Sequence, residues 1–70
     1  MENKFNITRV TFMLGITRPT MYRYIFLYDS GSYKFIPKKV LSVLKYIDSC
    51  TIINESTYFE IFKRCKNGRG

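Results

Sequence analysis

The sequence has no histidine, no tryptophan, only two cysteines and only five acidic residues among its 70. Cys50 and Cys65 have no second cysteine pair and no histidine to complete a zinc site, so both are expected to be buried free thiols. Five scattered carboxylates, without a phosphate-cradling glycine loop, offer no group of residues suited to acid–base catalysis. The sequence therefore predicts a protein that is not an enzyme and that needs neither a metal nor a cofactor.

Long hydrophobic runs are also absent. No run of about 18 apolar residues occurs, so no membrane-spanning helix is expected. The first six residues are polar and lack the apolar segment and cleavage site of a secretory signal, which favours a cytoplasmic protein. The 70 residues are 46% hydrophobic and 17% aromatic, so they are expected to fold as one domain. Its core would be thin, and association would help to stabilise it.

Residues 7–28, ITRVTFMLGITRPTMYRYIFLY, carry the most informative pattern of the chain. Gly15 falls between two short amphipathic segments, where a residue without Cβ can turn the chain at little steric cost. Thr17 can cap the second segment, and Pro19 lies in its first turn, where the missing N–H costs nothing. The apolar residues that two crossed helices would share are Val10, Leu14, Ile16, Met21 and Tyr24. This arrangement is typical of a DNA-binding helix-turn-helix, although a plain structural corner has the same spacing.

The charge favours the DNA-binding interpretation. The chain carries 12 basic and five acidic residues, for a net charge of +7. Residues 1–45 hold eight basic and two acidic residues, whereas residues 46–70 hold four basic and three acidic ones. The positive charge therefore surrounds the proposed helix-turn-helix, as a phosphate-binding surface requires.

Apolar periodicity predicts a single all-α domain over residues 1–70. The four expected helices span residues 8–14, 18–28, 37–49 and 55–66. Thr8 is the expected cap of the first helix, Pro37 the first residue of the third, and Asn54 the cap of the fourth. Residues 29–32 form a turn signal, and residues 33–36 are expected to be an extended connector that can form a brief strand.

The segment LGITRPTMYRY resembles the helix-turn-helix of bacterial and phage transcription regulators. The following loop and the segment PKKVLSVLKYI are similar in order to the lactose-repressor headpiece and to the lambda-repressor-like phage repressor and Cro group. Thr11 stands where these proteins usually have alanine, and six residues cannot supply the helix that usually precedes the motif in phage repressors. The resemblance implies a small regulator that binds double-stranded DNA, of the kind found in phages, plasmids and other mobile elements.

The second expected helix would read the major groove. With Met21 and Ile25 toward the core, Arg18 and Tyr22 lie opposite and are the candidates for base contacts. The threonines at the start of this helix suit phosphates, as do the later lysines. All residues predicted to contact DNA are Arg9, Thr17, Arg18, Pro19, Thr20, Tyr22, Arg23, Lys34, Lys38 and Lys39. The alternative for the basic residues among them is a solvated surface.

The last expected helix has more large apolar residues than a small domain can bury on one side. Four of them are expected to divide between the core and a second protomer of a homodimer: Tyr58, Phe59, Ile61 and Phe62. The resemblance to phage repressors also implies dimerisation by this helix. Phe12, on the outer side of the first helix, requires a cover from the fourth helix or from another protomer.

Two other functions remain open at this stage. One is a DNA-bending accessory factor for recombination, replication or conjugation, such as an excisionase. The other is a protein-interaction module that uses the aromatic last helix and has no affinity for DNA.

Overall fold

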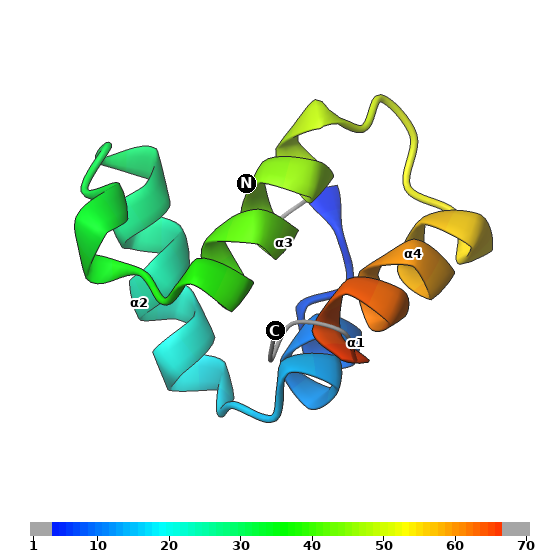
Figure 1. Cartoon of the computed structure of the whole chain (residues 1–70), viewed down its shortest axis with the longest axis horizontal. Coiled ribbons are helices and arrows are strands. Elements are labelled where there is room, and N and C mark those ends of the chain that lie inside the picture. The colour runs from blue at the N-terminus through cyan, green and yellow to red at the C-terminus, as the bar shows by residue number, and fades with distance from the viewer. Residues whose placement is uncertain (1–3, 67–70) are drawn as a thin grey trace.

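The computed structural model describes residues 4–66, and this part of the chain is entirely helical apart from its connections (Figure 1). The four α-helices in it are α1 (Ile7–Leu14), α2 (Arg18–Asp29), α3 (Lys38–Ser49) and α4 (Glu55–Lys66). A short 3-10 helix, η2 (Tyr33–Phe35), lies between α2 and α3. Residues 4–66 contain no strand. The expected small all-α bundle is therefore confirmed.

The chain turns sharply between α1 and α2 at Gly15, as the position of this glycine between two amphipathic segments predicts. Gly15 has a φ of 71°, in the left-handed region, and its N–H donates to the Phe12 carbonyl at 3.2 Å. The next N–H, of Ile16, donates to the Thr11 carbonyl at 3.2 Å. These two bonds satisfy carbonyls that the end of α1 would leave open. The chain thus leaves α1 and enters α2 within three residues.

Apolar side chains fill the angle between α1 and α2. Val10 and Met21 are fully buried, and Leu14 is 8% exposed. Thr11 is 4% exposed, and its hydroxyl donates to the Thr8 carbonyl at 2.9 Å. The hydroxyl of this buried threonine is therefore satisfied.

The cap of α1 differs from the expected one. Asn6, and not Thr8, precedes the helix, and its side-chain oxygen accepts from the Arg9 N–H at 3.2 Å. Asparagine is at least as good a cap as threonine, and it lies two residues earlier. The cap of α2 is the predicted one, because the Thr17 hydroxyl accepts from the Thr20 N–H at 3.4 Å.

The connector at residues 33–36 was expected to be extended, and that expectation is wrong for most of it. Residues 33–35 form η2, in which the Phe35 N–H donates to the Ser32 carbonyl and the Ile36 N–H to the Tyr33 carbonyl. A strand needs a partner, whereas these local bonds satisfy the backbone without one. Pro37 is extended and precedes α3 instead of forming its first turn.

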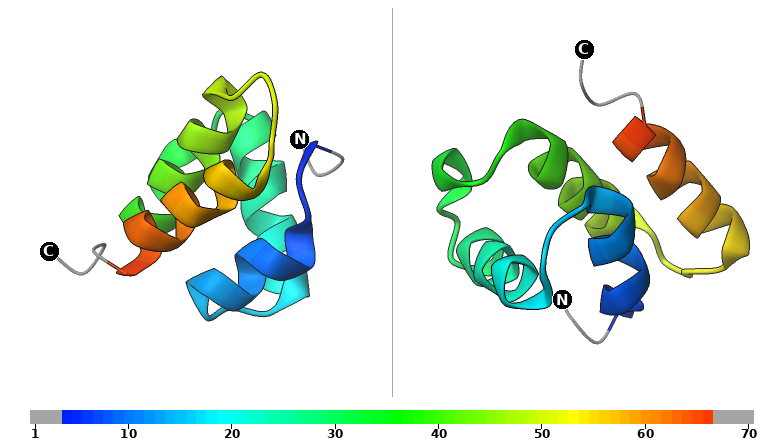
Figure 2. Two further views of the ribbon diagram at one scale, coloured as in Figure 1. Left: turned by 90° about the vertical axis from the view of Figure 1, so that its right-hand side faces the viewer. Right: turned by 90° about the horizontal axis from the view of Figure 1, so that it is seen from below.

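The core lies where all four helices meet. Helix α3 contacts both α2 and α4, and α1 also contacts both of them (Figure 2). The largest fully buried side chains are Val10, Met21, Val43, Leu44, Ile47 and Ile61. Cys65 is buried as predicted, but Cys50 is only half-buried at the end of α3 because its segment leads into an exposed loop.

Candidate nucleic-acid interface

Helix α2 separates its residues onto two sides. Met21 and Ile25 are buried, and Tyr24 and Tyr28 are half-buried against the core. Arg18, Pro19 and Arg23 are exposed, Thr20 is half-buried, and Tyr22 and Phe26 are 39% and 69% exposed. The exposed residues share one side of the helix because they recur at the helical period. They form a continuous surface, named here the α2 face: Thr17, Arg18, Pro19, Tyr22, Arg23 and Phe26.

The cations of the α2 face take part in no ion pair with the other described residues. Within residues 4–66, the ion pairs are Arg9–Glu55 and Lys63–Glu60, so Arg18 and Arg23 take part in none. Unpaired guanidinium groups remain free to bind carboxylates, phosphates or base edges. The α2 face can therefore accept an anionic ligand without first breaking an internal salt bridge.

Thr17 and Thr20 are hydrogen-bonded to each other at the start of α2. The Thr17 hydroxyl donates to the Thr20 hydroxyl at 2.9 Å while it caps the helix. Both hydroxyls lie beside Arg18, at the end of the helix that carries the partial positive charge of the peptide dipoles. This end of α2 therefore attracts an anion, and Arg18 supplies the formal positive charge there.

The predicted lysines divide into two groups. Lys34 is exposed on η2, with its amino nitrogen 5.3 Å from the centre of the Phe35 ring, and Lys38 is exposed at the start of α3. These two follow α2 directly in the fold. Lys39 is half-buried and turned toward α4, where its charge lowers the pKa of Cys65 against the larger raising effect of burial. Lys39 thus differs from Lys34 and Lys38 in being half-buried and close enough to act on a side chain of α4.

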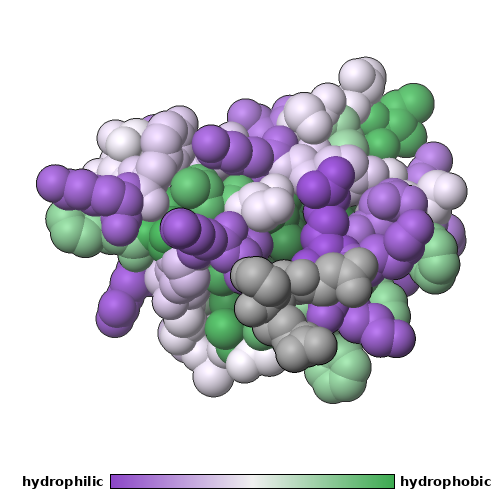
Figure 3. Space-filling model, viewed as in Figure 1, coloured by the Kyte–Doolittle hydropathy of each residue, from purple (hydrophilic) through white to green (hydrophobic). Residues whose placement is uncertain are grey.

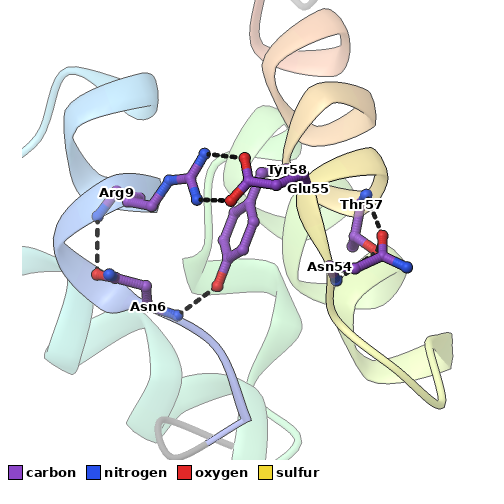
Figure 4. A network of polar contacts seen from close by, with 6 residues as sticks. All are labelled: Asn6, Arg9, Asn54, Glu55, Thr57 and Tyr58. Atoms are coloured by element: carbon purple, nitrogen blue, oxygen red, sulfur yellow. Dashed lines mark hydrogen bonds and ion pairs between the residues drawn. The ribbon is translucent and has the colours of Figure 1, made fainter.

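Arg9 has an internal partner that the sequence did not reveal (Figure 4). Its guanidinium donates to both carboxylate oxygens of Glu55, at 2.8 and 3.0 Å, and stacks 4.1 Å from the centre of the Tyr58 ring. The Tyr58 hydroxyl in turn accepts from the Asn6 N–H at 2.8 Å. Arg9 therefore joins α1 to α4, and a phosphate would have to compete with Glu55 for its guanidinium.

The same contact changes the acidity of its two charged members. The guanidinium of Arg9, by hydrogen bonding and then by charge, holds the pKa of Glu55 below its ordinary value of 4.5. The hydrogen bond with Glu55 likewise raises the pKa of Arg9, so the pair stays ionised over the whole physiological range. Helix α4 begins here with the predicted cap, since the Thr57 N–H donates to the Asn54 side-chain oxygen at 3.1 Å.

A second basic surface lies along α3 and includes one residue of α4. It is an open groove of about 470 Å³ lined by Lys38, Leu41, Ser42, Lys45, Tyr46, Ser49 and Arg64. The Arg64 guanidinium stacks 4.3 Å from the centre of the Tyr46 ring. Lys38 and Lys45 are seven residues apart and so share one side of α3, a spacing that could have drawn attention to Lys45 in the sequence. No spacing in the sequence indicates that Arg64 would line this groove.

The residues predicted for dimerisation occupy different environments. Tyr58 and Ile61 are 8% and 0% exposed, so the core of a single chain already buries them. Phe59 and Phe62 are 62% and 47% exposed. Only these two of the four remain available to a partner, and the division between core and surface runs along α4 as its amphipathic pattern predicts.

Searches against protein-family models, curated protein sequences and solved structures found no match to this chain. Within residues 4–66 there is no cluster of three or more side chains that could hold a metal ion. None of the helices in this range combines the length and the apolar character that a membrane span needs.

Proposed function

We propose that this chain is a sequence-specific double-stranded DNA-binding protein that inserts α2 into the major groove. The observation that carries the proposal is the α2 face, whose Arg18 and Arg23 take part in no ion pair within residues 4–66, on a helix held by a glycine corner against α1. A short helix presented in this way fits the width of the major groove, and its first residues reach base edges.

Individual residues of the α2 face have distinct roles in this proposal. Arg18 donates two hydrogen bonds to a guanine, which is the commonest specific contact of an arginine in the major groove. Tyr22, one turn further, packs against a thymine methyl group or donates to a phosphate. Thr17 and Pro19, with the half-buried Thr20 beside the face, bring the start of the helix against the DNA backbone, and Arg23 neutralises a phosphate.

Positive charge beside α2 supports contacts to the phosphates that flank the groove. Lys34 is exposed on η2 and Lys38 at the start of α3, so both follow α2 closely in the chain. Each lysine that neutralises a phosphate releases counterions and adds to a salt-dependent, sequence-independent affinity. The basic groove along α3 continues from Lys38 and can follow the same backbone.

The biological role that this binding supports best is regulation of transcription by a small protein of a phage, plasmid or other mobile element. The support is the resemblance of residues 14–24 and of the order of helices after them. A role in bending DNA for recombination or replication would use the same surface. Inverted repeats beside a promoter would favour the regulator, and clustered direct repeats at an origin or attachment site would favour the accessory factor.

Selection of bound sites from a library of random duplexes tests the proposal. The wild type should enrich a short motif, and Arg18→Ala should lose preference at one position of it, at a cost of about 1–3 kcal/mol. The control is Lys63→Ala, which removes one cation from α4 outside both basic surfaces and should keep the motif. Identical motifs for the wild type and Arg18→Ala would remove Arg18 from base reading, and no enrichment by the wild type would refute sequence-specific binding.

A further inference from the structure

The groove along α3 follows one side of that helix over its whole length. The residues of α3 that line it recur at the helical period, and α4 adds one more: Lys38, Leu41, Ser42, Lys45, Tyr46 and Ser49, with Arg64. This surface is named here the α3 groove. Its first and last residues on α3 span about three helical turns, or about 16 Å along the axis. Its shape therefore matches a rod-like partner such as a second helix.

The charged residues that line the α3 groove are all cations. Lys38, Lys45 and Arg64 take part in neither ion pair of residues 4–66. The Lys45 amino nitrogen lies 5.9 Å from the centre of the Tyr33 ring, and the Arg64 guanidinium lies 4.3 Å from the centre of the Tyr46 ring. Contact with a ring face restricts where a cation lies and leaves its N–H groups able to donate at the edge.

The acids nearest in the chain to these cations have other partners. Asp48 of α3 accepts from the Tyr28 hydroxyl of α2 at 3.1 Å, and Glu60 of α4 pairs with Lys63 at 3.6 Å. Neither acid lines the α3 groove. A second copy of this chain, with a net charge of +7, would add positive charge to a positive surface, so an acidic partner fits the groove better.

Uncharged residues form the middle of the α3 groove. Leu41 and Tyr46 are half-buried and thus partly open to solvent, and the exposed Ser42 and Ser49 are small. Purple hydrophilic residues surround paler and green ones over α3 in the centre of Figure 3. A duplex backbone can follow the lysines but has no aliphatic group to cover Leu41. A small ligand would not be enclosed by so open a groove, whereas small-molecule sites bury most of their ligand.

We propose that the α3 groove binds an acidic amphipathic helix of a partner protein. Two carboxylates seven residues apart on that helix meet Lys38 and Lys45, and an aliphatic side chain between them covers Leu41. Ser42 and Ser49 leave room for the close approach of two packed helices. The proposal does not rest on DNA binding, because it uses no residue of the α2 face.

The amide chemical shifts of the full chain, followed by NMR while a helical peptide is added, test this proposal. The probe is a capped peptide of about 18 residues, rich in alanine and glutamine so that it is helical, with two glutamates seven residues apart and a leucine three residues after the first. We expect the amides of residues 38–49 and 64 to shift, with a dissociation constant on the order of 100 µM. A control peptide of the same composition, with its leucine on the opposite side of the helix, should bind about fivefold more weakly.

Paired substitutions separate the α3 groove from the general attraction of a basic chain for an acidic peptide. Lys45→Gln and Arg64→Gln should each raise the dissociation constant about two- to fivefold. The matched control is Lys34→Gln on η2, which removes the same charge outside the groove and should leave the constant unchanged. Circular dichroism checks that each variant keeps the helical content of the wild type.

A duplex of random sequence, added at the same concentration as the peptide, is the last comparison. Larger shifts at residues 38–49 and 64 with the duplex than with the peptide would assign the groove to phosphates and overturn the proposal. Equal affinities for the two peptides, equal effects of Lys45→Gln and Lys34→Gln, or peptide-induced shifts outside the groove would also overturn it. Loss of sequence-specific DNA binding would leave all of the peptide results unaffected.

Discussion

Helices α2 and α4 have the same length and similar beginnings, yet they present opposite surfaces. Each has 12 residues, each starts at a polar cap (Thr17 and Asn54), and each buries one side in the shared core. On α2, Arg18 and Arg23 take part in no ion pair within residues 4–66, whereas Glu55 and Glu60 pair with Arg9 and Lys63 on the α4 side. The two ion pairs of the described residues thus lie on the α4 side, although Arg64 and Lys66 there take part in neither of them.

The largest expected effect is a loss of stability that unfolds the chain and so removes the exposed surfaces of α2 and α4 together. Met21 is fully buried between α2 and the rest of the core, so Met21→Ala should lower the free energy of unfolding by about 2–5 kcal/mol. In a domain of 70 residues this loss should leave a substantial unfolded fraction at 37 °C. Thermal unfolding followed by circular dichroism measures it.

Phe26→Ala provides the control for that experiment. It truncates a larger side chain on the same helix, but one that is 69% exposed, and it should change the free energy of unfolding by less than about 0.5 kcal/mol. Similar losses in the two variants would mean that α2 is not oriented as described.

Substitutions at the corner before α2 should give the next largest loss in the free energy of unfolding. Gly15 has a φ of 71°, and a Cβ built on it would meet no atom within 4 Å. Gly15→Ala should therefore cost about 1–2 kcal/mol through backbone conformation alone. Gly15→Asn should cost less, because asparagine tolerates the left-handed region better. Chemical denaturation of the three proteins ranks them, and an alanine variant as stable as the wild type would contradict this conformation.

Lowering the pH should weaken the contact between Arg9 and Glu55 on the α4 side and should leave the α2 face unchanged. The pKa of Glu55 is lowered in the folded chain, so its contact with Arg9 stabilises the fold above the ordinary pKa of 4.5 and is lost as the pH falls through the folded value. Glu55→Gln removes this dependence while the remaining carboxylates titrate in both proteins.

The difference in melting temperature between the wild type and Glu55→Gln measures that effect. It should be largest near pH 7 and shrink between about pH 5 and pH 3. A difference that stays constant over this range would show that the ion pair contributes nothing to stability. Because the pair is exposed to solvent, this is the smallest of the expected effects.

Local patterns in the sequence were sufficient to predict the corner at Gly15 and which residues of α2 are exposed on most of the α2 face. Gly15, Thr17 and Pro19 act through their own backbone or the next turn, and the apolar spacing around them repeats within a few residues. The division of α4 into a buried and an exposed side also followed from its period. These features depend on neighbours along the chain, so a single sequence carries the information.

Contacts between distant segments could not be predicted in the same way. Arg9 and Glu55 are 46 residues apart, and no local spacing distinguishes an arginine that meets a glutamate from one that stays free. The four residues of the connector at 33–36 were too few for a period, so residues 33–35 of the extended connector expected there form a 3-10 helix in the structure. The ion pair depends on what the folded chain brings together, whereas η2 depends on local bonds that so short a segment does not indicate.

The salt dependence of DNA affinity tests the central claim that the α2 side, and not the α4 side, meets the phosphates. We expect the wild type to bind its selected duplex with an affinity that falls steeply as salt rises, with a slope that Lys38→Ala reduces by about one unit. Lys63→Ala, an equal charge change on α4, should leave the slope unaltered. Equal slopes for the three proteins, or a duplex affinity independent of salt, would contradict the account.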